Sequence, residues 1–213
     1  MKARIPNLLT GLRLALCLFM FVALAAAAGS VPWLSDQLTG ADRASLERWA
    51  VIAFVVAAVT DFFDGWLARR WNVTSLWGAI LDPIADKVLV CGAVLGLLAL
   101  APGTFVVLPC ALILFREFTV SALREVAAGK SIRLPVTTLA KWKTTLQLVA
   151  LTGELVLASW AAFSLPDDPA ILGPAALIIH ATLWLAAIIT VITGAQYWEQ
   201  ARKALEAEEG PPV

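Results

Sequence analysis

Residues that bind zinc or form disulfide bonds are scarce in this chain. Of its 213 residues, only one is histidine and three are cysteine. Cys17, Cys91 and Cys110 fall in separate apolar stretches without paired spacing, so we expect buried thiols and neither a disulfide framework nor a zinc site. Lysine plus arginine equals aspartate plus glutamate, at 16 each, and this zero net charge indicates no partner by itself.

The sequence also shows no soluble domain, no internal repeat and no glycine-rich phosphate loop of the soluble nucleotide-binding type. Hydrophobic residues, by contrast, make up 60% of the chain, and the mean hydropathy is +0.82. These values lie far outside the composition of soluble proteins and indicate several membrane-spanning helices. The sequence therefore predicts an all-α polytopic membrane protein.

Six apolar windows are long enough to cross the hydrocarbon layer, which takes about 20 residues. They lie near residues 8–28, 49–68, 77–101, 104–127, 140–163 and 171–197. Proline and glycine predict tight turns at 101–103 and 165–169, and the mixed charges of 30–48 predict an external loop with a short amphipathic helix near 43–48. We expect one membrane domain, residues 1–200, followed by a polar tail, residues 201–213.

Basic residues are distributed unevenly between the two sides of the predicted bundle. All 16 lysines and arginines except Arg43 and Arg48 fall on the side that carries both termini. Cytoplasmic loops of membrane proteins carry an excess of lysine and arginine. Both termini are therefore expected in the cytosol, together with the adjoining ends of the second and third predicted helices.

Four aspartates interrupt the apolar sequence at these helix ends, in the frame D-x2-D-G-x2-A-R-x8-G-x3-D-x3-D. The spacings place Asp61 with Asp64, and Asp82 with Asp86, on one face of each helix. Acidic groups are costly in a bilayer, so we expect the two faces to meet around cations. Oxygen ligands without histidine or cysteine favour two Mg²⁺ or Mn²⁺ ions over zinc. Pro83 is expected either to kink the third helix or to begin it.

Small residues and one arginine accompany these acids. Gly65, Ala68 and Gly78 allow facing helices to approach closely and leave room for a ligand. Arg69 stands about one turn beyond Asp64, where its guanidinium can bind phosphate. Divalent cations, an arginine and a groove of small residues together predict a bound pyrophosphate.

The frame resembles the signature of the CDP-alcohol phosphotransferases, integral membrane enzymes of phospholipid synthesis, at all eight fixed positions. The resemblance implies that an alcohol hydroxyl attacks the lipid-side phosphorus of a CDP-linked lipid and releases CMP. It implies that the four aspartates ligate the metal ions and that Asp86 is also the general base. It further implies that Gly65, Arg69 and Ser75 hold the nucleotide, and that the protein is a homodimer.

Four basic residues of the fourth and fifth predicted helices indicate the acceptor. Arg116 and Arg124 are eight residues apart, about two turns along one face, and Lys141 and Lys143 open the next helix on the same side. A cationic pocket within the membrane predicts an acceptor that carries its own phosphate. The alternative for Arg124 and both lysines is that they extend to cytoplasmic headgroups.

These segments, with 5–13 (IPNLLTGLR) and 57–65 (AAVTDFFDG), resemble the bacterial phosphatidylglycerophosphate synthase branch of the family over nearly the whole chain. This resemblance implies CDP-diacylglycerol as donor and glycerol 3-phosphate as acceptor, the latter held by the four basic residues. It implies that Asn7 and Thr10 border the nucleotide of CDP-diacylglycerol. The expected location is the bacterial inner membrane, with the active site open to the cytosol.

Three other interpretations remain open. The acceptor could be another alcohol, such as inositol phosphate, serine or phosphatidylglycerol. The chain could be a cation transporter, although the acids of a transport path would be spread across the membrane depth and here they crowd one side. The acids could merely pair with Arg69, Arg70 and Lys87, but four acids exceed three cations and the glycines of the frame would then be unexplained.

Overall fold

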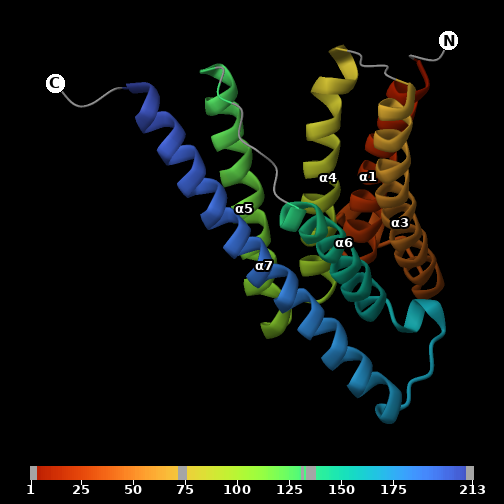
Figure 1. Ribbon diagram of the computed structural model, residues 1–213. Helices are drawn as coiled ribbons and strands as arrows, with labels where there is room; N and C mark the ends of the chain where they lie inside the picture. The colour runs from red at the N-terminus through yellow and green to blue at the C-terminus, as the bar shows by residue number, and fades with distance from the viewer. Residues whose placement is uncertain (1–3, 72–75, 131, 133–137, 210–213) are drawn as a thin grey trace. The chain divides into compact units, whose positions relative to one another are not determined.

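The computed structural model describes residues 4–71, 76–130, 132 and 138–209, and these residues form helices and connecting turns without a strand (Figure 1). Six long helices account for most of the chain. In chain order the elements are α1 (Arg4–Ala27), the short α2 (Pro32–Ser35), α3 (Gly40–Trp71), α4 (Leu76–Leu100), α5 (Thr104–Gly129), α6 (Thr138–Ala158), the 3₁₀ turn η1 (Ala161–Phe163) and α7 (Pro169–Glu209).

Each of the six predicted spans coincides with one of the long helices, and the expected all-α membrane character is confirmed. Within the described residues, four helices are long and apolar enough to cross a bilayer, over Leu8–Ala27, Ile80–Leu100, Thr104–Gly129 and Pro169–Glu206. The described parts of α3 and α6 are not among these four. A count of six spans, and their orientation, therefore stay predictions.

The structure places two of the predicted connecting or terminal segments within longer helices. Residues 101–103 and 165–168 lie outside helices, as their prolines and glycine predict. The amphipathic helix expected near 43–48 is the first part of α3, which runs for 32 residues. Most of the predicted polar tail is also helical, because α7 continues to Glu209.

Residue contacts divide the chain into two compact units. Unit 1 consists of Met1–Gly103 and Leu151–Ile179, and unit 2 of Thr104–Ala150 and His180–Val213. The aspartate frame belongs to unit 1, whereas the basic residues of α5 and α6 belong to unit 2. Each unit is described by itself below.

In unit 1, α1 packs along both α3 and α4, which contact each other far less (Figure 1). Buried side chains such as Met20 and Leu24 of α1 and Phe54 of α3 form its core. The approach of α1 to α4 requires glycine at position 96, because a Cβ there would lie 2.9 Å from Leu24 Cβ. Small residues that let backbones approach are a main source of helix association within membranes.

The start of α3 is fixed by a reciprocal cap between Thr39 and Asp42. The Thr39 amide and hydroxyl donate to Asp42 Oδ2 at 3.0 and 2.7 Å, and the Asp42 amide donates to Thr39 Oγ1 at 3.3 Å. Such a box satisfies amides that have no partner inside the helix. The same bonds lower the pKa of Asp42, so its contribution to stability is present at neutral pH and is lost as the pH falls through that lowered value.

Unit 2 contains α5, the first part of α6 and most of α7. Val120 of α5 and Tyr197 of α7 are buried together in its core. Near the start of α5, the rings of Phe105 and His180 stack with centroids 5.8 Å apart. The long helices of this unit therefore contact one another through both apolar and aromatic side chains.

Candidate active site

Helix α1 carries two buried polar side chains, Thr10 and Arg13, to the aspartates of α3 and α4. They are three residues apart, so they share one face of the helix. Thr10 Oγ1 donates a hydrogen bond to Asp82 Oδ1 at 2.7 Å. Arg13 Nη1 lies 3.1 Å from Asp86 Oδ1 and forms a second ion pair with Asp61 Oδ1. Three of the four predicted carboxylates are thus gathered around α1.

The two aspartates of α4 lie on either side of Pro83 and both contact α1. Pro83 lies within α4, which begins at Leu76, so the proline does not start the helix. The side chains of Asp61 and Asp86 are 36% and 58% exposed, although both contact a fully buried arginine. Each carboxylate therefore contacts a buried cation and also has a surface that ligands can reach.

Sequence reasoning missed Arg13 as a site residue. It considered Arg69, Arg70 and Lys87 as ionic partners of the aspartates, whereas the structure shows Arg13 in contact with two of them. A signal was present in the sequence. A charge in the middle of a membrane-spanning segment is a functional candidate by default, and Arg13 lies within the apolar span Leu8–Ala27.

The donor atoms at this site suit Mg²⁺ or Mn²⁺, because Asp61, Asp82 and Asp86 offer only carboxylate oxygens. Among the side chains that the structure describes, no three acidic, histidine or cysteine residues come close enough together to hold an ion. Asp64, the fourth predicted ligand, lies outside those described side chains. The metal site therefore stays a prediction. The same holds for the other predicted residues whose side chains are outside the description, namely Asn7, Gly65, Arg69, Ser75 and Lys141.

Three of the four predicted acceptor residues come together in unit 2. Glu117 forms ion pairs with buried Lys143 and, at 3.5 Å, with Arg116. Arg124 Nη2 donates to Tyr197 Oη at 2.7 Å, and its Cζ lies 4.9 Å from the ring centroid. Arg116 Cζ lies 5.8 Å from the same ring, within the range of a cation–π contact. Tyr197, the only tyrosine of the sequence, was not expected at this place.

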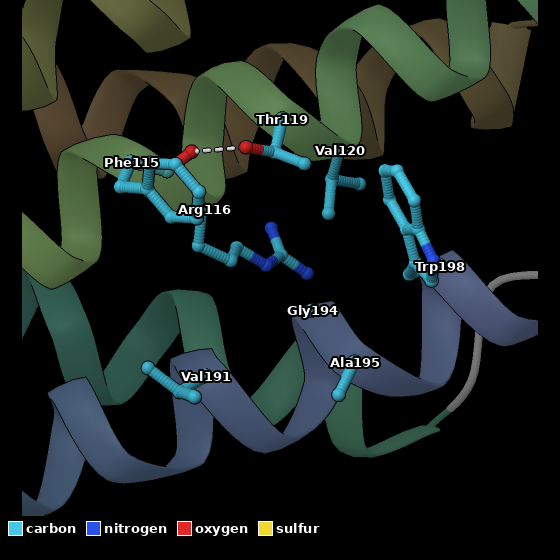
Figure 2. Close-up of a pocket in the computed structure, with 8 residues that line it drawn as sticks. All are labelled: Phe115, Arg116, Thr119, Val120, Val191, Gly194, Ala195 and Trp198. Atoms are coloured by element: carbon cyan, nitrogen blue, oxygen red, sulfur yellow. Dashed lines mark hydrogen bonds between the residues drawn. The ribbon is translucent and has the colours of Figure 1, made fainter.

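A cavity of about 340 Å³ adjoins this basic cluster between α5 and α7. Figure 2 shows the guanidinium of Arg116 reaching from α5 toward Gly194 of α7. The hydroxyl of Thr119 donates to the carbonyl of Phe115 at 2.8 Å. Among the eight residues that line the cavity, Arg116 alone carries a charge. A Cβ at position 194 would lie 2.8 Å from Arg116 Cγ, so the Arg116 side chain can cross α7 here only because residue 194 is glycine.

The chain belongs to the CDP-alcohol phosphatidyltransferase family. A profile of that family matches residues 3–193, which include the aspartate frame and the basic residues of α5 and α6. This confirms the resemblance that the aspartate frame indicated. The family assignment thus covers both of the residue groups described above.

Individual relatives carry a more specific name. A protein of Rickettsia bellii is 44% identical over 152 residues, which is 71% of this chain and 78% of the relative. One of Cereibacter sphaeroides is 39% identical and one of Haemophilus influenzae is 33% identical, each aligned over 96% of this chain and 97% of its own length. All three are named CDP-diacylglycerol–glycerol-3-phosphate 3-phosphatidyltransferase.

Replacing Glu117 by glutamine should destabilise the protein, because it leaves the buried ammonium of Lys143 without its anion. Loss of one partner from a buried pair costs about 3 kcal/mol or more. Thermal unfolding in detergent measures this loss. The control is Glu206→Gln, which breaks an exposed pair with Arg202 and should cost about 0.5 kcal/mol at most. Equal losses in the two variants would contradict the importance of the Glu117–Lys143 pair.

Proposed function

We propose that this protein transfers the phosphatidyl group of CDP-diacylglycerol to glycerol 3-phosphate, giving phosphatidylglycerophosphate and CMP. The observation that carries the proposal is that Asp61, Asp82 and Asp86 all contact side chains on one face of α1. Membership of the family supports the reaction class. The shared name of relatives aligned over nearly the whole chain supports the choice of substrates.

The aspartates have two roles in this proposal. Asp61, Asp64, Asp82 and Asp86 would hold two Mg²⁺ or Mn²⁺ ions, which when bound offset the negative charge of the pyrophosphate. Asp86 takes the proton from the attacking hydroxyl of glycerol 3-phosphate. The hydroxyl oxygen then bonds to the lipid-side phosphorus, the bond from that phosphorus to the bridging oxygen breaks, and CMP leaves. Asp86 afterwards releases its proton to water.

The donor and the acceptor engage different residues. Asn7, Gly65, Arg69 and Ser75 hold the nucleotide of CDP-diacylglycerol, and Thr10 acts there through its hydrogen bond to Asp82. The phosphate of the acceptor, glycerol 3-phosphate, is bound by four basic residues, namely Arg116, Arg124, Lys141 and Lys143.

The electrostatics of unit 2 support a phosphate at the basic cluster. Arg116 and Lys143 are 8% and 2% exposed, and they share the single carboxylate of Glu117. Arg116 and Arg124 also lie near enough to Lys143 to repel its charge. Among the side chains that the structure describes here, three cations accompany the one acid, Glu117, and leave an excess of positive charge. A phosphate dianion would offset that excess and accept hydrogen bonds from both guanidinium groups.

In this proposal the enzyme is a homodimer in the bacterial inner membrane, with both termini and the active site on the cytosolic side. The bias of lysine and arginine toward one side supports the orientation, and the family resemblance supports the dimer. Accessibility of the C-terminal tail in inverted and right-side-out membrane vesicles tests the orientation. Cross-linking in native membranes tests the dimer.

The acceptor assignment predicts the selectivity of CMP release. Purified protein with Mn²⁺ or Mg²⁺ should release CMP from CDP-diacylglycerol when glycerol 3-phosphate is added, and should release little with serine, inositol phosphate or phosphatidylglycerol. The measurement is a competition assay across these alcohols at equal concentration. Equal turnover with another alcohol would overturn the acceptor and leave the reaction class intact.

The role of Asp86 predicts a loss of turnover without a matching loss of donor binding. Asp86→Asn removes the base while keeping the size of the side chain, so we expect CMP release to fall by about 10²–10⁴-fold. Binding of labelled CDP-diacylglycerol should persist at a substantial level. Wild-type activity in this variant would show that Asp86 is not the base.

The role of Arg116 predicts an effect on one substrate only. Arg116→Ala should raise the KM for glycerol 3-phosphate about 10- to 100-fold, the loss expected for a hydrogen bond between charged groups. The KM for CDP-diacylglycerol should change little. Arg202→Ala, at an exposed arginine of the same unit, is the control and should leave both values near wild type. A change confined to the lipid donor would show that Arg116 is misplaced.

A further inference from the structure

Arg13 is the most deeply buried charged side chain of unit 1 for which the structure describes ionic contacts. Its side chain is 0% exposed, and Nη1 contacts one carboxylate from each of two helices. The contact to Asp86 is 3.1 Å, and the contact to Asp61 is a direct ion pair. Because α1 packs along both α3 and α4, the guanidinium lies at the point where the three helices meet.

Two carboxylates that share one guanidinium nitrogen lie close together and repel each other. Asp82, one turn from Asp86 on α4, adds a third negative charge, and its described contact is the uncharged hydroxyl of Thr10. Divalent ions would neutralise this cluster while they are bound. When the ions leave, the repulsion remains unless a cation of the protein stays in place.

We propose that Arg13 is this resident counter-ion, a positioning residue that holds Asp61 and Asp86 together on α3 and α4 when the divalent ions are not bound. The proposal rests on the proposed metal site. A fully buried guanidinium cannot move into water as a surface side chain would, so its charge stays beside the carboxylates. Arg13 would therefore keep the site assembled between turnovers.

A resident counter-ion has a consequence that a purely structural contact lacks. If Arg13 carries part of the neutralisation, removal of its charge should make the stability of the protein depend more strongly on metal ions. If Arg13 serves only to pack three helices, its removal should lower stability equally with and without metal. The response to metal thus separates the two roles without any measurement of activity.

The experiment compares the unfolding temperature of the full-length protein in detergent, with EDTA and with saturating Mn²⁺. In EDTA, Arg13→Gln should lower Tm by about 10 °C relative to wild type, the shift expected for breaking a buried ion pair in a chain of this size. Mn²⁺ should restore most of that loss, so its effect on Tm is larger in the variant than in wild type. Electron paramagnetic resonance of added Mn²⁺ confirms binding.

Two further variants act as controls. Arg13→Lys keeps the positive charge and should respond to Mn²⁺ nearly as wild type does. Arg48→Gln makes the same change at an exposed arginine of α3 and should leave the metal response unchanged. If Arg13→Lys responded as strongly as Arg13→Gln, the shape of the guanidinium rather than its charge would be decisive, and the proposal would fail.

The possible outcomes are distinct. A wild-type protein whose Tm is insensitive to Mn²⁺ argues against the proposed metal site itself. A second outcome is that Mn²⁺ raises the Tm of the wild-type protein, while Arg13→Gln lowers Tm equally in EDTA and in Mn²⁺. That outcome overturns only the role of Arg13. If Arg13→Gln does not accumulate in membranes, expression in Mn²⁺-supplemented medium decides: recovery supports the proposal, and continued absence contradicts it.

Discussion

The ion pairs of Arg13 with Asp61 and Asp86 explain why three apolar helices of unit 1 have a defined arrangement. Apolar side chains gain little hydrophobic free energy from leaving lipid for another apolar surface, so the packing of Leu24 against Gly96 acts through close van der Waals contact, and the ion pairs add to it. A charge in the bilayer costs about 3 kcal/mol on insertion scales, and an opposite charge on a facing helix offsets part of that cost. The contacts of Arg13 with Asp61 and Asp86 therefore contribute both to the packing of α1, α3 and α4 and to the arrangement of the acidic site.

The two units carry an excess of opposite charge among their described polar side chains. In unit 1 the acids outnumber the described cation that contacts them, which suits a ligand with positive charge. In unit 2 the cations Arg116, Arg124 and Lys143 surround Glu117 and Tyr197, which suits an anion. Within the proposed reaction, the first arrangement serves a metal-bound pyrophosphate and the second serves a free phosphate. A single mixed cluster would instead neutralise itself.

Helical periodicity explains how much of this could be predicted from the sequence. Apolar windows located all six long helices, and the spacing of four residues correctly placed Asp82 and Asp86 on one face of α4, where both contact α1. The partners themselves could not be found this way. Arg13 meets Asp86, and Arg124 meets Tyr197, across 73 residues of sequence in each case. Such pairings follow from helix packing, about which local spacing carries no information.

Gly194 has no side chain, yet it determines where the side chain of Arg116 can lie. The Arg116 side chain crosses α7 where position 194 has no Cβ, and a methyl group there would come within 2.8 Å of Arg116 Cγ. Even alanine, the mildest replacement in a helix, would push the arginine aside. A saturation mutagenesis scan would therefore find intolerance at a chemically inert site, and an inspection limited to ionisable side chains would overlook it.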